Sequence, residues 1–332
     1  MKLRWGVIGC AGIAVHSVIP AIQQSERGEV AAIASRGIDK ARETAQKLNI
    51  AKAYGAYEEL LADPDIDAVY IPLPNHLHKE WTIKAAEAGK HVLCEKPAAL
   101  DAAEAEQMIA ACRNAGVLFA EAFMYRLHPR VERVKSIIAS GEIGELRAVN
   151  GCFTFNNAED AGNVRYRQEW GGGSIYDVGV YPLSAARWII GAEPEAATVH
   201  ALFSEQHGGV DMMASGLIEF ANGVGMTFDC GMWAAYRQGV EVLGTEGRIE
   251  LKGAFTDSEP FTVYTKEGER VEGPFSDINN YVSQADQFAR AVFGEAIYPF
   301  PAEDAIANMR LVDACLLSAR TRSRVLVKGT NE

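Results

Sequence analysis

The first 121 residues alternate short runs of β-branched and apolar residues with stretches in which apolar residues recur every three or four positions. The short runs predict buried strands, and the wider spacing predicts amphipathic helices. Strands that alternate with helices build a parallel sheet covered on both faces, so a doubly wound α/β domain is predicted. The expected strands are Leu3–Gly9, Val30–Ser35, Ala68–Ile71, His91–Cys94 and Val117–Ala120.

Several residues mark helix boundaries in this part of the chain. Pro20 lies inside the first apolar helix and has no amide hydrogen, so we expect a kink or a restarted helix there. Asp101 followed by Glu104 has the spacing of a capping box, and Gly116 has the place of a helix stop. A helix between residues 101 and 116 is therefore predicted.

The remainder of the chain follows a different pattern, in which strand-like runs succeed one another with turns between them. Asn222-Gly223 separates two such runs and is a strong hairpin signal. Helical spacing returns near 131–138, 175–190, 278–292 and 302–319. We expect a Rossmann-type domain over residues 1–122 and, over residues 123–332, an α+β domain with an open, largely antiparallel sheet. Its expected strands are Leu146–Phe155, Ala197–Phe203, Ala214–Phe220, Val224–Cys230, Val240–Leu243, Arg248–Leu251 and Phe261–Tyr264.

Composition narrows the functional classes. The net charge of −12 over 332 residues argues against a nucleic-acid or anionic-membrane surface. No apolar run reaches the roughly 20 residues that span a bilayer, and the segment before Gly9 is too short for a secretory signal. We therefore expect a cytoplasmic protein. No C-x-x-C pair occurs, and His76 and His78 do not share a helical face, so no metal site is expected.

The turn after the first strand resembles a dinucleotide-binding fingerprint. The pattern G-x-G-x-x-G/A brings a tight backbone turn and a helix N-terminus close to a pyrophosphate. Gly9 and Ala14 fit the outer positions, whereas Ala11 replaces the middle glycine and Gly12 follows it. We expect nucleotide binding at this turn. Its residues are Gly9, Cys10, Ala11, Gly12, Ile13 and Ala14.

The end of the second strand indicates which nucleotide is preferred. NAD-binding sites usually carry an acidic residue there for the ribose hydroxyls. This chain has Ser35 and Arg36 instead, with Lys40 one turn further on. A hydroxyl and a guanidinium can bind a 2′-phosphate through charge-assisted hydrogen bonds. NADP is the predicted cofactor, with NAD as the alternative.

Two constellations carry candidate chemistry. Lys96, between Glu95 and Pro97, follows the fifth strand at the sheet edge where such folds bind ligands. The second is the run Gly171-Gly172-Gly173 followed by Asp177 and Tyr181, whose spacing of four places both side chains on one helical face. We expect the glycines to let the backbone approach a ligand closely.

These residues resemble the glucose–fructose oxidoreductase / inositol 2-dehydrogenase (Gfo/Idh/MocA) family over nearly the whole chain. The resemblance rests on the Gly9–Ala14 turn, Pro72-Leu73-Pro74-Asn75 with His78, Glu95-Lys96-Pro97, residues 121–126, and the glycine run with Asp177 and Tyr181. The inositol-type branch of the family has histidine at the position of Tyr181. The branches of xylose dehydrogenase and dimeric dihydrodiol dehydrogenase have tyrosine there, as this chain does.

The resemblance implies NAD(P)-linked redox chemistry on sugars, cyclitols or dihydrodiols, and a homo-oligomer formed through the C-terminal sheet. It also implies that Pro72, Asn75, His78 and Glu95 line the cofactor site together with Lys96. Arg126 and Arg165 are expected at the rim of the substrate site.

Hydride transfer at a carbinol carbon requires a proton to leave or join its oxygen. The pKa of a free tyrosine, about 10, is too high for a base at neutral pH. A cation about 4 Å away can lower it by as much as about three units. We therefore expect Tyr181 to be the acid/base, Lys96 the cation that tunes it, and Asp177 the residue that orients a substrate hydroxyl or Lys96.

Two alternatives remain open within the sequence. The enzyme is either a sugar dehydrogenase or reductase, or a trans-dihydrodiol dehydrogenase, and the residues above do not separate the two. From another class, relatives of this fold include non-catalytic regulators that bind the nucleotide. A regulator has no need of both Lys96 and Tyr181, and this chain has both.

Overall fold

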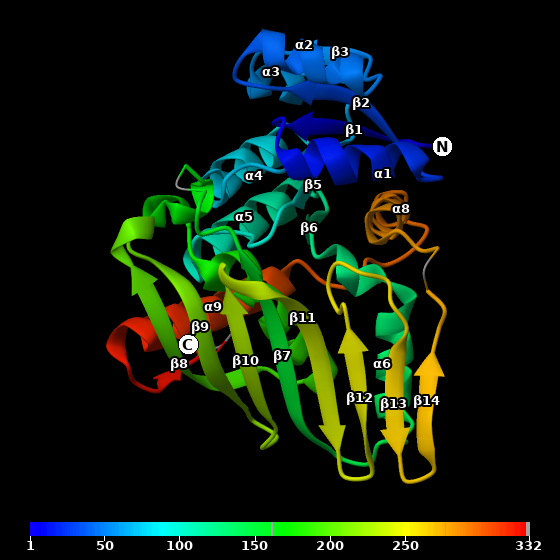
Figure 1. The fold of residues 1–332 in the computed structure, drawn as a ribbon. Helices are drawn as coiled ribbons and strands as arrows, with labels where there is room; N and C mark the ends of the chain where they lie inside the picture. The colour runs from blue at the N-terminus through cyan, green and yellow to red at the C-terminus, as the bar shows by residue number, and fades with distance from the viewer. Residues whose placement is uncertain (161, 276, 330–332) are drawn as a thin grey trace. The chain divides into compact units, whose positions relative to one another are not determined.

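The computed structural model describes residues 1–160, 162–275 and 277–329 (Figure 1). The chain forms two compact units. The first contains Met1–Leu127 and Asn279–Ile306, and the second contains His128–Ile278 and Ala307–Glu332. These units differ from the proposed domains 1–122 and 123–332 mainly in the segment 279–306, which packs with the first unit.

The first unit is built on a six-stranded parallel sheet with the order β3-β2-β1-β4-β5-β6. This order is that of a doubly wound Rossmann sheet, which confirms the predicted fold class. The three-residue strand β3, half-buried at the sheet edge, is absent from the sequence-based prediction. The strands are β1 Leu3–Ile8, β2 Gly28–Ala34, β3 Lys52–Tyr54, β4 Ala68–Ile71, β5 His91–Cys94 and β6 Phe119–Glu121.

The first helix was expected to kink or restart at Pro20, but it continues through this residue. A π-helical segment, η1 (Ala14–Val18), passes directly into helix α1 (Ile19–Gln24), and this local change in hydrogen bonding precedes the proline that lacks an amide hydrogen. The N-cap half of the predicted capping box is confirmed, because the Asp101 carboxylate accepts a hydrogen bond from the Glu104 amide (2.8 Å). The Glu104 carboxylate accepts in turn from the amide of Leu100 (3.2 Å), one residue before the N-cap. The other helices of this unit are α2 Ile38–Lys47, α3 Tyr57–Leu61, η2 Asn75–Leu77, α4 His78–Glu87, α5 Ala102–Ala115, η3 Met124–Leu127 and α8 Asn280–Val292.

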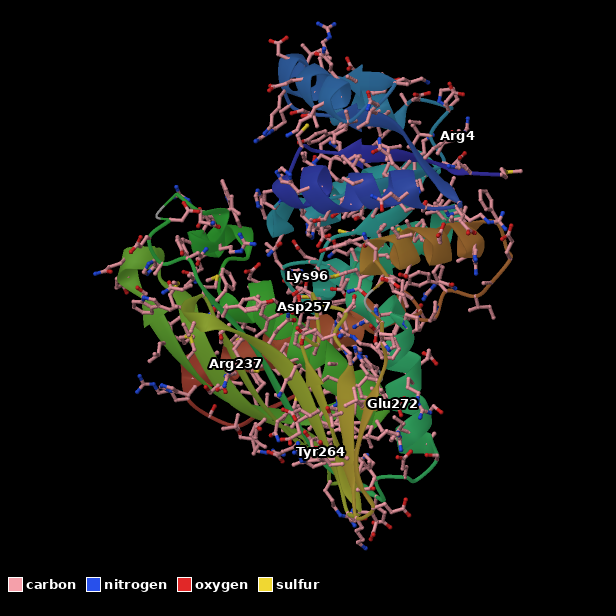
Figure 2. All side chains as sticks on the ribbon, turned by 45° about the vertical axis from the view of Figure 1, so that its right-hand side comes forward. Arg4, Lys96, Arg237, Asp257, Tyr264 and Glu272 are labelled. Atoms are coloured by element: carbon pink, nitrogen blue, oxygen red, sulfur yellow. The ribbon has the colours of Figure 1, made fainter. Side chains whose placement is uncertain are left out.

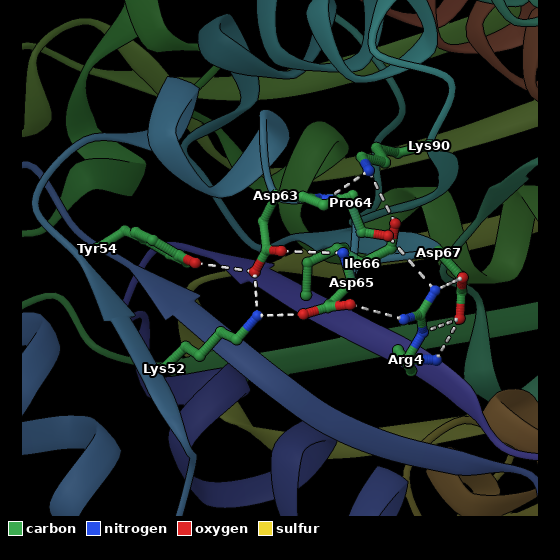
Figure 3. A network of polar contacts seen from close by, with 9 residues as sticks. All are labelled: Arg4, Lys52, Tyr54, Asp63, Pro64, Asp65, Ile66, Asp67 and Lys90. Carbon is green, nitrogen blue, oxygen red and sulfur yellow. Dashed lines mark hydrogen bonds and ion pairs between the residues drawn. The ribbon is translucent and has the colours of Figure 1, made fainter.

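A network of charged groups ties together the amino ends of the parallel strands (Figure 3). Arg4 on β1 pairs with Asp67 (2.7 Å), and Lys52 on β3 pairs with Asp63 (2.9 Å). The Lys90 ammonium donates to the carbonyl oxygen of Asp63 (2.8 Å) in the loop before β4. The Gly9 turn and Lys96 lie at the other end of the strands, away from this network.

The second unit contains a nine-stranded sheet with the order β14-β13-β12-β11-β7-β10-β9-β8-β15. Neighbouring strands are antiparallel except β7 and β10, so the predicted open, largely antiparallel sheet is confirmed. Gly223, with φ of +78°, forms the turn between β9 and β10, as Asn222-Gly223 predicted. The strands are β7 Leu146–Asn156, β8 Pro194–Ser204, β9 Val210–Phe220, β10 Gly225–Gly231, β11 Trp233–Gly244, β12 Gly247–Lys252, β13 Phe261–Thr265, β14 Gly268–Glu272 and β15 Val325–Leu326.

Helix α7 (Val180–Ile190) packs directly on this sheet. A Cβ atom on Gly151 of β7 would lie 2.7 Å from Cβ of Pro182, so the glycine permits the close approach. The π-helical segment η6 (Ile175–Gly179) leads into α7. Among the described residues, no helix is long and apolar enough to span a membrane. The remaining helices are α6 Pro129–Ala139, η4 Val164–Tyr166, η5 Gln168–Trp170, η7 Glu205–His207 and α9 Glu303–Thr321.

Candidate functional site

The predicted nucleotide-binding turn follows β1 in the first unit. Gly9 has φ of +113°, and a Cβ atom there would lie 3.0 Å from Cδ2 of Leu73, so only glycine suits this position. The helical hydrogen bonds begin with the Val15 amide, which donates to the Ala11 carbonyl (3.0 Å). The amides just before Val15 therefore have no partner within the helix, and Gly12 is exposed. An open turn with free amides fits a pyrophosphate.

The tip of β2 lies beside this turn. A Cβ atom on Gly9 would come within 3.9 Å of the Tyr57 hydroxyl. Burial raises the pKa of Tyr57, and the nearby Arg36 charge opposes that rise. Arg36 and Lys40 are exposed, and neither forms an ion pair within the described part of the chain. Ser35 is buried, so its hydroxyl is less accessible than the sequence predicted. Two unpaired cations are thus available for an anionic group.

His78 is fully buried between the loops that follow β4 and β5. One ring nitrogen lies 2.7 Å from the Leu73 carbonyl oxygen, and the other lies 2.9 Å from the Pro97 carbonyl oxygen. Both nitrogens are therefore engaged by the backbone, and burial lowers the pKa of the ring. In this structure His78 holds the two loops together. Pro72 and Asn75, also predicted at the cofactor site, lie between β4 and α4, with Pro72 in the loop after β4 and Asn75 at the start of η2.

Lys96 lies just beyond β5, with its side chain half-buried (Figure 2). Its backbone amide donates to the Glu95 carboxylate (3.3 Å), which also accepts a hydrogen bond from the Tyr70 hydroxyl (2.6 Å). Burial raises the pKa of Glu95, although the Lys96 charge opposes that effect. The peptide bond after Lys96 is cis, and the Ala98 amide donates to Glu121 (2.9 Å). Buried hydrogen bonds thus define the path of the backbone around Lys96.

Arg126 does not lie open at a rim. Its guanidinium pairs with Asp304 (2.5 Å) and lies over the rings of Phe123 (4.3 Å) and Phe300 (4.8 Å). The side chain is 3% exposed. Burial opposes the charged form, but Asp304 raises the pKa of Arg126 overall. Within the first unit this arginine joins the segment 279–306 to the Rossmann sheet. Its predicted contact with substrate stays a prediction.

In the second unit, Arg165, Asp177 and Tyr181 do come together. The Arg165 guanidinium donates to the Asp177 carboxylate (2.7 Å). The Asp177 charge raises the pKa of Arg165, with a smaller contribution from Tyr181. The Tyr181 ring lies 5.3 Å from the Phe153 ring and 5.4 Å from the Phe255 ring. Arg165, which was predicted only at the rim of the substrate site, is thus the cationic partner of Asp177.

The role expected for the glycine run is wrong in one respect. A Cβ atom on Gly172 would lie 2.4 Å from the Arg165 carbonyl oxygen, and one on Gly173 would lie 2.1 Å from Oδ1 of Asp211. Gly173 also has φ of +118°. These glycines make room for the protein's own backbone and carboxylate, rather than for a ligand.

Asp211 is a residue that sequence reasoning missed. Its carboxylate accepts hydrogen bonds from the Ser174 hydroxyl (2.7 Å) and the Ile175 amide (2.8 Å). Burial raises its pKa to about 6. The one signal in the sequence is an acidic residue inside the apolar run Val210–Ala214. Such a residue in a buried strand needs hydrogen-bond partners.

A Rossmann sheet with a glycine-containing first turn, joined to an α+β unit, defines a protein of the NAD(P)-dependent oxidoreductase class. Residues 3–123 match the oxidoreductase family with an NAD-binding Rossmann fold (GFO_IDH_MocA), and residues 131–250 match the GFO/IDH/MocA C-terminal domain. The chain belongs to the Gfo/Idh/MocA oxidoreductase family. The resemblance seen in the sequence is therefore confirmed.

Relatives in this family have named activities. The D-xylose 1-dehydrogenase (NADP(+)) 2 of Haloferax volcanii is 40% identical over 328 residues, covering 97% of this chain and 99% of that protein. A trans-1,2-dihydrobenzene-1,2-diol dehydrogenase of Mus musculus is 34% identical over 279 residues, covering 82% and 80%.

Solved structures of other oxidoreductases have the same fold as this chain. The aldose-aldose oxidoreductase from Caulobacter crescentus, complexed with glycerol, superposes with a TM-score of 0.92 at 25% identity, covering 98% of this chain and 100% of that one. A 3-ketoreductase from Actinomadura kijaniata, in complex with NADP and TDP-benzene, has a TM-score of 0.89 at 33% identity, covering 96% and 98%.

Proposed function

We propose that this protein is an NADP-preferring dehydrogenase or reductase that transfers hydride to or from the carbinol carbon of a sugar-like alcohol or ketone. The observation that carries the proposal is the grouping of Tyr181, Asp177 and Arg165 in the unit that would bind substrate. Lys96 stands at the ligand-binding end of β5 in the nucleotide-binding unit. In this reaction a phenol can carry the proton, an ammonium can lower the pKa of that phenol, and a carboxylate can orient the substrate.

When bound, the nicotinamide ring supplies or accepts the hydride. Tyr181 gives a proton to the substrate oxygen in reduction and takes one from it in oxidation. The Lys96 ammonium binds the same oxygen and favours the ionised phenol. Arg165 holds the Asp177 carboxylate in place, and in the proposed reaction this carboxylate orients a neighbouring substrate hydroxyl.

The unpaired cations at the tip of β2 support the preference for NADP. Arg36 provides a planar fork of donors that suits a phosphate, and Lys40 adds a second charge. The xylose dehydrogenase relative is named for NADP(+), and the related ketoreductase binds NADP. We assign the 2′-phosphate to Arg36, with NAD as a poorer cofactor.

The named relatives support a carbohydrate-like substrate. Their activities concern xylose, aldoses and sugar nucleotides, with dihydrodiols in the mammalian proteins. A trans-dihydrodiol is the second candidate, because the mammalian relatives are named for that substrate.

We also propose a homo-oligomer that forms through the C-terminal sheet. Leu202 and Phe203 on β8 and Leu217 on β9 expose between 42% and 51% of their surface. Apolar side chains that gather on one sheet indicate a surface that another chain covers. Light scattering should give more than one subunit per particle, and Leu217→Glu should reduce that number.

The test is a screen of aldoses, ketoses, cyclitols and dihydrodiols that follows nicotinamide absorbance, repeated with Tyr181→Phe and Lys96→Ala. We expect each change to lower kcat by about 10²- to 10⁴-fold while NADPH binding is retained. Tyr264→Phe, which removes a phenol from β13 of the same unit, is the control. Full turnover in the Tyr181→Phe variant would refute the assignment of the acid/base.

A further inference from the structure

The helix that carries Asp177 and Tyr181 begins against a carboxylate that the proposed reaction does not use. Asp211 lies on β9 and is 2% exposed. Its Oδ2 atom accepts hydrogen bonds from the Ser174 hydroxyl and the Ile175 amide, at 2.7 and 2.8 Å. Both donors belong to the first turn of this helix.

No cation compensates the charge of Asp211 within the part of the chain that the structure describes. The Cys230 thiol on β10 is the neighbouring titratable group, with its Sγ 3.7 Å from the Ser174 hydroxyl oxygen. Taking a carboxylate out of water without an ion-pair partner costs several kcal/mol, and hydrogen bonds recover only part of that cost. An apolar residue at this place on β9 would avoid that cost, but it would leave the Ser174 hydroxyl and the Ile175 amide without this acceptor. The carboxylate is thus committed to the start of the helix.

We propose that Asp211 is a positioning residue that fixes the start of the catalytic helix and thereby the directions of Asp177 and Tyr181. The proposal rests on the proposed function, because it assigns a purpose to the orientation of those two side chains. Asp211 acts through the helix and does not itself touch substrate or cofactor.

The connection from Asp211 to the two site residues is short. Gly173 packs against Oδ1 of Asp211, and its carbonyl oxygen accepts a hydrogen bond from the Asp177 amide (3.0 Å). Oδ2 of the carboxylate thus binds the first turn of the helix, and Oδ1 lies against the residue just before it. The hydrogen bond between the Gly173 carbonyl oxygen and the Asp177 amide then connects this turn to Asp177.

The segment after this anchor is π-helical over Ile175–Gly179 and becomes α-helical at Val180. A π-helical turn is an uncommon conformation that neighbouring contacts must maintain. If the anchor is lost, we expect the segment to relax towards α-helix. That change rotates Tyr181 about the helix axis relative to the nine-stranded sheet.

The experiment compares Asp211→Asn, Asp211→Ala and Ser174→Ala in the full chain, with kcat and both KM values measured on the substrate identified in the screen. Asparagine keeps a carbonyl oxygen in the place of Oδ2, whereas alanine removes both acceptors. We expect Asp211→Ala to lower kcat by about 10- to 100-fold, because a displacement on the order of 1 Å has such an effect. The KM for NADPH should stay within about twofold, and Asp211→Asn, which keeps one acceptor but not the charge, should lose measurably less kcat than Asp211→Ala.

Asp229→Asn is the matched control, because this carboxylate on the neighbouring strand β10 also accepts a serine hydrogen bond but is 45% exposed. It should leave kcat unchanged. A purely structural role would instead lower the stability of Asp211→Ala and leave kcat per folded molecule at the wild-type value. That result would overturn the proposal.

If Asp211→Ala does not fold, Ser174→Ala and Asp211→Asn decide the question, alone and combined. Ser174→Ala and Asp211→Asn both act on the hydrogen bond between these two residues, so their losses of kcat should not add. The double variant should therefore lose little more kcat than the worse of the two single variants. Additive losses, or no loss in any of the three, would contradict the proposal. Turnover retained by Tyr181→Phe would instead refute the proposed function, whatever the Asp211 variants show.

Discussion

The replacement Arg36→Ala tests the choice between the two nicotinamide cofactors. Arg36 is exposed at the tip of β2, beside the Gly9 turn, and forms no ion pair within the described residues. The guanidinium is therefore not committed to a structural contact. Its loss should act on the 2′-phosphate of NADP and leave the stability of the first unit nearly unchanged.

The size of the effect follows from the type of contact. A charge-assisted hydrogen bond contributes about 1.5–3 kcal/mol, and each 1.4 kcal/mol is a factor of ten. We expect kcat/KM for NADP to fall by about 10- to 150-fold. The value for NAD should change by less than about threefold, because NAD has no 2′-phosphate. Lys40 remains in the variant, so the lower half of the range is expected.

The assay is a pair of initial-rate series with NADP and with NAD, at two salt concentrations. Lys47→Ala is the control, since it removes an equal charge from the far end of α2. The control should shift both cofactors equally and only at low salt, where long-range attraction is strong. A wild-type preference for NAD, or an unchanged kcat/KM for NADP in Arg36→Ala, would refute the reasoning.

Three further predictions concern stability. Asp211 contributes stability that is fully present below its ordinary pKa of 3.8 and is lost as pH rises through about 6, a change of about 3 kcal/mol. Urea unfolding should thus show Asp211→Asn gaining about 2 kcal/mol on the wild type between pH 4 and pH 7, and a pH-independent difference would contradict this. Asp304→Asn should lower the free energy of unfolding by about 3 kcal/mol, because the buried Arg126 loses its ion-pair carboxylate. Glu303→Gln, in an exposed ion pair, should lower it by less than about 1 kcal/mol. Equal losses of the two variants in urea unfolding would contradict the effect assigned to burial. Gly173→Ala should reduce both kcat and the unfolding temperature, because its Cβ would lie 2.1 Å from a carboxylate oxygen, while Gly162→Ala, which meets no atom within 4 Å, should change neither.

The architecture could be predicted because the strands at its centre are apolar on both faces or alternate regularly. Ala68–Ile71 and His91–Cys94 are predicted with their observed bounds. The edge strand β3 is short and half-buried, and the edge strand β14 is polar and mostly exposed. The pairing of both depends on residues outside the strands themselves. The sequence therefore contains little local signal for them.

The candidate site could be predicted only as far as residue type and spacing show it. The separation of Asp177 and Tyr181 indicates a shared helical face, and the structure brings them together with Arg165. The ion pair of Arg126 with Asp304 joins residues 178 positions apart, which no local pattern reveals. For the same reason, the packing of Gly173 against Asp211 could be found only from the structure.

Helix α8 has a consequence for how this chain is made and divided. Phe288 of that helix lies 4.9 Å, ring to ring, from Trp5 of β1, although more than 280 residues separate them. A ribosome must therefore release most of the polypeptide before the layer beneath the first strand can close. A fragment that ends at Leu127 would leave the Trp5 side of the sheet bare and prone to aggregation. Separate expression of a nucleotide-binding half requires residues 279–306 to be grafted back onto it.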